Sequence, residues 1–385
     1  MNDVRTLRRL VLLGLVLYAA AWAYRIYDRK YYVWLPGYAQ WMLHPDQPAA
    51  SPVHIFFVFV DHFEPGENYA IVERWLREYP VVAQRHRDCY GRPWQHTWFY
   101  PAEQTIDRNL IALRKLVASG YGETELHLHH GNDTQETARV KFEQAIAYLR
   151  KFDFLKTAGG ATHFAFIHGN WSLDNSRGRE FCGANRELAM LRELGCFADY
   201  TFPSLWQTSQ PPFVNNIYEA TDDERPKSYD HGFSLEQGRA PQGDLLIFQG
   251  PLVIAPVLNP RRLFFTVEDG DIHAGVPVTP QRADYWVRAN IHVTGREDWR
   301  FIKVHTHGAE SSEDAAETLG PHFDATLSYM EKAYNDGAHY VLHYVTAREA
   351  FNLARAAVDG RRGDPRQYYD YLIPPYIADG QRGLP

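Results

Sequence analysis

The sequence is poor in cysteine and has no block of basic residues. Its 385 residues include only Cys89, Cys182 and Cys196, which are too few for a disulfide framework and are not spaced as a zinc knuckle. Acidic residues (47) outnumber Lys and Arg (40), so the formal net charge is −7. We therefore expect no nucleic-acid partner, because binding to a phosphate backbone requires a basic surface.

Internal repeats and low-complexity stretches are absent as well. Hydrophobic residues make up 45% of the sequence and charged residues 23%, which is typical of a folded globular protein and excludes wholesale disorder. A chain of this length can bury a large core without disulfides. Histidine (18 residues) and tyrosine (24 residues) are abundant, and the histidines gather in a few short segments.

One long uncharged stretch, residues 10–24, lies near the N-terminus between Arg9 and Arg25. As a helix it would span about 22 Å, which is short of the ~30 Å hydrocarbon core of a membrane. A membrane anchor is favoured if both arginines extend to the interface, where the aromatic residues at the end of the stretch would also lie. A signal peptide cleaved near the small residue Ala23 and a buried helix are the alternatives.

These features divide the chain into four parts. We expect residues 1–30 to form a membrane anchor or signal segment and residues 31–52 a connector rich in Tyr, Trp and Pro. The body should extend over residues 53–360, with a loop-rich insertion at 206–260, and residues 361–385 should form a tail. Either an anchor or a signal peptide would place the body outside the cytoplasm, in the periplasm or at the cell surface.

Strand-like and helix-like patterns alternate through the body. Residues 53–60 form a near-continuous apolar run, as in a strand that is buried on both faces, and residues 106–117 have apolar side chains at helical spacing. The alternation predicts an α/β fold with a parallel sheet, either open or closed into a barrel. Strands are predicted at residues 53–60, 124–130, 162–168, 263–267, 289–293 and 301–305.

Polar clusters follow the predicted strands, at the edge where a (β/α) barrel keeps its active site. They contain Asp61, His62 and Glu64; His127, His129, His130 and Asp133; Asn170 and Trp171; Asp199; and His305 and His307. A charged or imidazole group at the end of an apolar strand is costly to bury unless it has a partner, and a metal ion is one such partner. Because imidazole and carboxylate suit Zn²⁺ and related ions, the clusters together favour a metal-assisted hydrolase.

The histidine spacing suggests which side chains meet. His127 and His129 would share one face of a strand, and His129 and Asp133 could converge if the chain turns between them. His305 or His307 could supply a ligand or a general acid.

On these residues the sequence resembles the polysaccharide deacetylase (NodB-like) family of the glycoside hydrolase/deacetylase superfamily. Asp61-His62 is similar to the Asp-Asp pair of that family, in which the first residue acts as base and the second binds metal. The segment from His129 to Asp133 resembles its His-x-x-x-His motif, and His305 resembles its late histidine, which acts as acid.

The resemblance covers residues 53–355 and implies a distorted (β/α) barrel of about seven parallel strands. It implies that His62, His129 and Asp133 hold Zn²⁺ or another divalent transition metal. The implied reaction is removal of N-acetyl or O-acetyl groups from a polysaccharide or other glycan. The expected catalytic residues are Asp61, His305 and His307, and the expected substrate contacts are Trp171, Asn170, Asp199 and His127.

Three other functions stay open at this point. A glycoside hydrolase would need two carboxylates that flank the scissile bond, and Asp61, Glu64 and Asp199 are candidates. A different metallohydrolase could use His127 and His129 as a pair of ligands. A non-catalytic envelope protein would bind glycan through Trp and Tyr faces without turnover.

Overall fold

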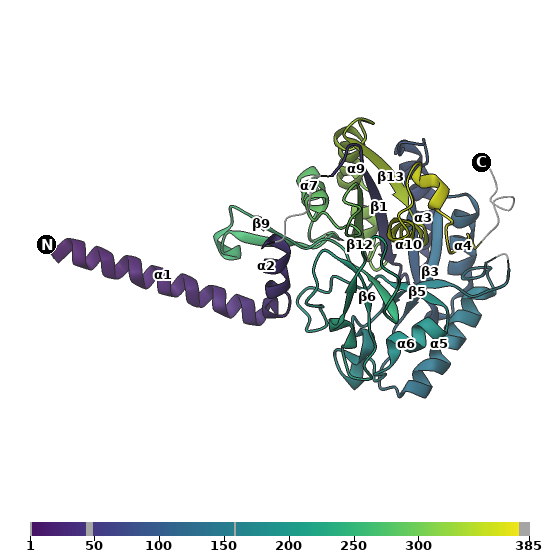
Figure 1. The fold of residues 1–385 in the computed structure, drawn as a ribbon, viewed down its shortest axis with the longest axis horizontal. Coiled ribbons are helices and arrows are strands. Elements are labelled where there is room, and N and C mark those ends of the chain that lie inside the picture. Colours follow the sequence, from purple (N-terminus) through teal and green to yellow (C-terminus); the bar gives the residue numbers. More distant parts are fainter. Residues whose placement is uncertain (1, 44–48, 158, 377–385) are drawn as a thin grey trace.

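The computed structural model describes residues 2–43, 49–157 and 159–376, so the last residues of the expected tail lie outside the described part. A long N-terminal helix projects from an α/β body, and a β-hairpin lies along the part of that helix next to the body (Figure 1).

The projecting helix, α1 (Asn2–Asp28), contains a segment from Val4 to Asp28 that is long and apolar enough to cross a membrane or to serve as a signal sequence. A 3-10 turn, η1 (Tyr31–Val33), and α2 (Leu35–Leu43) follow within the expected connector. Side chains from all three segments pack on the body in one apolar cluster, which includes Trp22, Ile26, Tyr31, Trp34, Leu205 and Leu252.

The body is built on an eleven-stranded sheet of order β11-β12-β1-β2-β3-β4-β5-β8-β6-β7, with β13 also paired to β1. Every pairing is parallel except those that β6 makes with β7 and β8. The strands are β1 (Val53–His62), β2 (His96–Pro101), β3 (Gly122–Leu128), β4 (Phe164–His168), β5 (Cys196–Asp199), β6 (Ile217–Ala220), β7 (Gly232–Ser234), β8 (Leu245–Phe248), β11 (Asp271–Ile272), β12 (Trp299–Thr306) and β13 (Tyr340–Val345).

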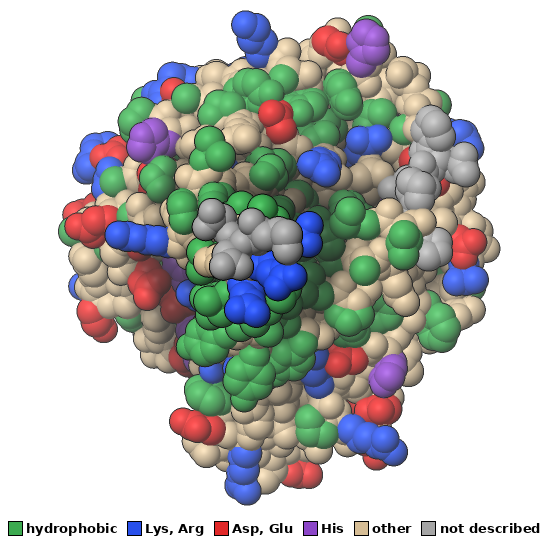
Figure 2. Space-filling model, turned by 90° about the vertical axis from the view of Figure 1, so that its left-hand side faces the viewer, with side chains coloured by type: hydrophobic (Ala, Val, Ile, Leu, Met, Phe, Trp, Pro, Cys, Tyr) green, Lys and Arg blue, Asp and Glu red, His purple; other side chains and the backbone are tan. Residues whose placement is uncertain are grey.

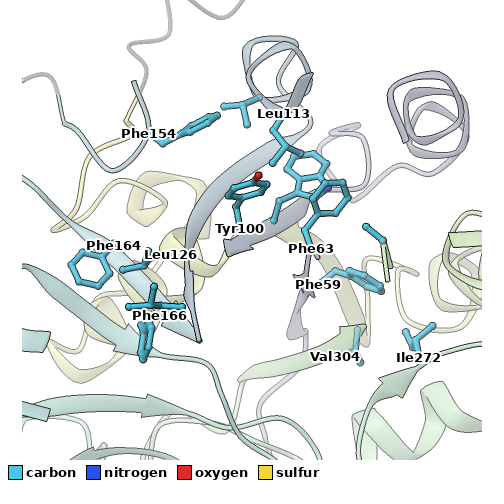
Figure 3. Close-up of a cluster of buried hydrophobic side chains, with 14 of the residues drawn as sticks. Phe59, Phe63, Tyr100, Leu113, Leu126, Phe154, Phe164, Phe166, Ile272 and Val304 are labelled. Carbon is cyan, nitrogen blue, oxygen red and sulfur yellow. The ribbon is translucent and has the colours of Figure 1, made fainter. Parts of the chain in front are cut away.

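Helices cover one face of this sheet and bury an apolar layer against it (Figure 3). Phe59 of β1, Leu126 of β3 and Phe166 of β4 belong to this layer, and Leu113 packs there from α4. The α-helices of the body are α3 (Tyr69–Arg85), α4 (Asp107–Ala118), α5 (Gln135–Arg150), α6 (Glu187–Glu193), α7 (Pro280–Arg288), α8 (Ser312–Thr318), α9 (Pro321–Ala333) and α10 (Ala347–Val358).

The opposite face of the sheet encloses α10, which is buried along nearly its whole length. Its many alanines allow the sheet to approach closely. Phe248 of β8 and Phe301 of β12 also meet there, with ring centroids 5.5 Å apart, although five strands separate them in the sheet order. The sheet therefore curls strongly, but no pairing within the described residues joins β8 to β12. The α/β fold with a largely parallel sheet is confirmed, whereas a closed barrel is not.

Several local expectations differ from the structure. The segment 206–260 is not only an insertion, because β8 lies within it and pairs in parallel with β5 as part of the main sheet. Residues 289–293 pack in the core but make only an isolated bridge. The strand expected at 263–267 is β10 (Phe265–Glu268), which pairs with β9 (Val253–Pro256) in a separate hairpin.

A buried ionic group joins α10 to the sheet and to the C-terminal segment. Arg348 is fully buried, and its Nε donates to Oε1 of Glu123 on β3 at 2.8 Å. Its Nη1 donates to Oδ1 of Asp370 and to the carbonyl oxygen of Ile373, both at 2.7 Å. One guanidinium thus ties three distant segments together.

Arg348→Leu should lower the free energy of unfolding by about 3–5 kcal/mol, because it leaves the Glu123 carboxylate buried without its cation. Urea denaturation followed by tryptophan fluorescence measures the change. The control is Arg114→Leu, which removes an exposed ion pair with Asp153 and should cost less than about 1 kcal/mol. Equal losses in the two variants would contradict this role for Arg348.

Candidate metal centre

Three pairs of potential ligands meet where β1, β3 and β12 end. In extended chain, residues two apart point to the same side, so each pair can face one point. The pairs are His62 and Glu64, His127 and His129, and His305 and His307.

Glu64 lies at the centre of the group. His127 Nε2 is 2.8 Å from Glu64 Oε1, and His129 Nε2 is 3.6 Å from Glu64 Oε2. The ligand atoms of these three residues lie within 4.8 Å of one another, and so do those of His62, Glu64 and His307. Burial acts to raise the pKa of Glu64, but the hydrogen bond and charge of His127 lower it overall. The carboxylate is therefore ionised at neutral pH.

Oxygen atoms outside the group orient two of the imidazole rings. His127 Nδ1 donates to the carbonyl oxygen of Ile167 at 2.9 Å, and its Nε2 donates to Glu64 Oε1 at 2.8 Å, so the ring is held with Nε2 facing Glu64. His129 Nδ1 lies 2.6 Å from Glu103 Oε1, so its Nε2 is directed to the same place. A ligating histidine typically has its second ring nitrogen bound to a carbonyl or a carboxylate in this way.

His62 is the residue whose surroundings most need explaining. Its side chain is only 1% exposed, and neither ring nitrogen has a hydrogen-bond partner within the described residues. Its ring stacks against those of His307 and Trp171, with centroid distances of 4.4 and 4.9 Å. Burial and the neighbouring histidines hold the pKa of His62 well below its usual value, so the ring is neutral. A metal ion, or water that it orders, would provide the missing partner.

His305 lies beside this group with a carboxylate behind it. The rings of His305 and His62 are 6.3 Å apart, and His305 Nε2 is 3.9 Å from Asp271 Oδ1. Burial lowers the pKa of His305 to about 3, although Asp271 acts in the opposite direction. Within the described residues its buried Nδ1 has no hydrogen-bond partner.

Asp61 was expected as a catalytic base, but both of its carboxylate oxygens already have hydrogen-bond partners. The Gly308 amide donates to Oδ1 at 2.8 Å, and His96 Nε2 is 3.1 Å from Oδ2. Burial raises the pKa of Asp61 to about 8. The carboxyl group thus supports the turn that follows His307, and this geometry does not present it to a substrate.

Asp133, expected as a ligand, requires a correction. Its Oδ2 accepts from Lys141 Nζ at 2.8 Å and lies 3.1 Å from His130 Nδ1, so it belongs to a different group from His62 and His129. The chain turns away after β3, and the Lys141 ammonium attracts the carboxylate there. In the candidate ligand set, Glu64 takes the place expected of Asp133.

The second group is buried behind the first. His130, His168, Cys182 and Glu187 also have ligand atoms within 4.8 Å of one another. However, the backbone N–H of Asn170 donates to His168 Nδ1 at 3.2 Å, so a neutral His168 ring carries its proton on Nε2. His130 Nε2 lies 2.9 Å from Glu187 Oε1. A protonated Nε2 cannot bind a metal ion, so His168 does not act as a ligand in this arrangement, although that atom has no hydrogen-bond partner within the described residues.

The expected substrate residues have different surroundings. Trp171 is half-buried, and one ring face covers His62. The Asn170 side-chain amide donates to the carbonyl oxygens of His130 and Phe181, so it holds the loops around the site together. Asp199 is fully buried and accepts hydrogen bonds from Thr201. The structure therefore does not bring Asn170 or Asp199 to the open side of the centre.

Two residues that shape the candidate metal centre were not predicted as site residues from the sequence. Glu103 lies in a 3-10 turn after β2, a strand that the apolar pattern did not indicate. Gly169 follows β4, and a Cβ atom there would lie 2.4–2.6 Å from three atoms of the His129 ring. A glycine directly after a strand was the available signal, because close approach of another group requires that residue.

No family model matches the chain, and no curated protein matches it. Comparison with solved structures finds a 4-alpha-glucanotransferase from Thermococcus litoralis at 11% identity and a TM-score of 0.40. The match covers 76% of this chain and 39% of the glucanotransferase chain. That enzyme is a distant structural neighbour of this chain.

Proposed function

We propose that the protein is a metal-dependent hydrolase with Glu64, His127 and His129 as the ligands of one divalent ion, with zinc as the best candidate. The proposal is carried by the orientation of His127 and His129, whose Nδ1 atoms are held by outside oxygens while both Nε2 atoms face Glu64. Three protein ligands leave a fourth position open, as in catalytic zinc sites. His62 and His307 would border that position.

A bound ion would polarise an acyl oxygen and make a water molecule more acidic. His305 is neutral at pH 7 and could accept the proton of the attacking water and then pass it to the leaving amine or alkoxide. Asp271 would stabilise the protonated ring from the other side. In this scheme His305 takes both the base role expected of Asp61 and its own expected acid role.

For the substrate we propose an N-acetyl or O-acetyl group on a polysaccharide or other glycan. The resemblance of the strand-end motifs to deacetylases supports this choice, and so does Trp171, a half-buried aromatic ring next to His62 and His307. We further propose that α1 anchors the body to a membrane, with the body outside the cytoplasm. A glycan at the cell envelope would be accessible from that position.

Zinc content tests the ligand set. Elemental analysis of the purified full chain should find about one zinc ion per chain in the wild type. His127→Ala and His129→Ala should each contain almost none, because each loses one of three ligands. His322→Ala, which removes a histidine whose side chain is 60% exposed, should retain zinc. A folded wild-type protein that takes up no zinc would overturn the proposal.

His305→Ala should retain its zinc and release acetate from acetylated glycans about 10²-fold or more slowly, because it removes the proton acceptor. Acetate can be measured enzymatically with an acetylated chitin oligosaccharide as substrate. Loss of zinc from this variant would show that His305 is a ligand.

Gly169→Ala should weaken zinc binding by about 10- to 100-fold, because the new methyl group would displace the His129 ring from Glu103. Competition with a chromogenic chelator measures the affinity. Gly159→Ala is the matched control, since a Cβ atom at position 159 would meet no heavy atom within 4 Å. Equal affinities in the two variants would contradict the role of the close contact.

A further inference from the structure

The hairpin of β9 and β10 is held against the part of α1 next to the body (Figure 1). The Tyr18 hydroxyl donates to the carbonyl oxygen of Leu263 at 3.2 Å, and the rings of Trp22 and Phe265 are 5.7 Å apart. Arg25 also donates to the carbonyl oxygens of Arg262 and Phe265. The hairpin tip therefore lies beside the last turns of the apolar stretch of α1.

That tip exposes large apolar side chains. Leu258 is 100% exposed and Phe264 46% exposed, and hydrophobic side chains surround the projecting helix when it is seen end-on (Figure 2). Most acidic side chains on this face lie toward its edge (Figure 2). If α1 spans a bilayer, Leu258 and Phe264 enter the interfacial layer, where exposed apolar groups are stable.

A groove of about 690 Å³ lies between α1, the hairpin and the body. Its volume is within the range of small-molecule binding sites. Four arginines line it on the side of α1 and the hairpin, namely Arg25, Arg29, Arg261 and Arg262. Within the described residues no ion pair engages Arg25, Arg261 or Arg262, and both hairpin arginines are exposed.

The other side of the same groove is acidic: Asp269, Asp271 and Glu268 line it with His273, and Glu268 is paired there with Arg282. On the α1 side one carboxylate, Asp28, also lines the groove, and it is paired with Arg29. Asp271 is the carboxylate 3.9 Å from His305, whose ring is 6.3 Å from that of His62. The groove thus has three arginines without an ion pair among the described residues at the end near α1 and the hairpin, and carboxylates that can accept hydrogen bonds from hydroxyl groups at the end next to His305. A ligand with a phosphate at one end and a polyhydroxylated group at the other would match this distribution.

We propose that the groove binds the lipid-phosphate portion of a glycan carried on a membrane lipid. The arginines would bind the phosphate or diphosphate at headgroup level, the acyl or prenyl chain would remain beside α1 and the hairpin tip, and the sugar would be directed toward Asp271. Guanidinium groups suit this task because they bind phosphate through two parallel hydrogen bonds. This inference rests on the proposed function, since it names the substrate class of the same site.

Binding of farnesyl diphosphate to the full-length protein tests the inference without turnover. The protein is placed in nanodiscs of phosphatidylcholine, and affinity is measured by equilibrium titration. Arg261→Ala/Arg262→Ala should weaken binding by about tenfold or more, as loss of charge-assisted hydrogen bonds predicts. The control, Arg77→Ala/Arg114→Ala, removes two exposed arginines of the outer helices and should bind as the wild type does.

Two further probes identify the source of the phosphate. Inorganic diphosphate should bind at least about tenfold more weakly than farnesyl diphosphate, because it lacks the apolar part. Nanodiscs that contain phosphatidylglycerol should not abolish the binding. Equal affinity for the two diphosphates, or complete competition by phosphatidylglycerol, would overturn the proposal in favour of a free anion or an ordinary headgroup.

Whether the groove contributes to catalysis is tested by comparing the activity on a lipid-linked sugar with the activity on the free sugar. For the double arginine variant, kcat/KM for an acetylated sugar on a lipid diphosphate, divided by kcat/KM for the free acetylated sugar, should fall about tenfold. An unchanged ratio would show that the groove does not bind the substrate during the reaction. Failure of the proposed function has a different signature, because a wild type without zinc or turnover could still bind farnesyl diphosphate.

Discussion

The parallel pairing of β12, β1, β2 and β3 is the constraint on which the candidate centre depends. Neighbouring strands lie about 4.8 Å apart, so side chains at the same level on adjacent strands come within ligand distance. The register places Val60 opposite His305 and Pro101 opposite His127. A slip of one residue would turn His62 and Glu64 toward the helical layer and separate them from the other histidines. The apolar core on both faces of β1 prevents such a slip, because it buries every residue from Ile55 to Val60.

The energetics of the site differ from those of the core around it. Arg348 and Glu123 are buried against each other and joined by a hydrogen bond, whereas neither ring nitrogen of His62 has a hydrogen-bond partner within the described residues. An unsatisfied buried polar group costs about 1–3 kcal/mol. A side chain stays in such an unfavourable position only where the surrounding structure is rigid enough to keep it there. Here α10 and the curled sheet supply the rigidity, so the stability of the body maintains an arrangement that is unfavourable in isolation.

Much of this arrangement could be predicted from local patterns. The apolar runs that became β1, β3, β4 and β12 placed His62, His127, His129 and His305 at strand ends, and parallel pairing then brought them together. Asp133 and Glu64 could not be ranked as ligands, because the choice depends on how the chain turns after each strand and on where the Lys141 ammonium lies. β8 was hidden in a segment rich in turn residues, since its four residues are apolar only over a short run. The curl of the sheet depends on contacts between residues far apart in the sequence, so no local sequence pattern predicts it.

The contacts of Trp22 and Ile26 with the body also limit how the protein can move. A helix joined by a flexible linker would let the body swivel and sample many heights above a bilayer. Here the helix end, the α2 elbow and the hairpin are packed together, so the position of the site relative to the helix axis is nearly constant. With α1 in a membrane, the candidate centre would lie at one set distance from the surface, and encounters with membrane-bound ligands would depend on lateral diffusion within the plane. Lengthening the chain between α1 and α2 would therefore change which ligands the candidate metal centre can reach, without altering any of its residues.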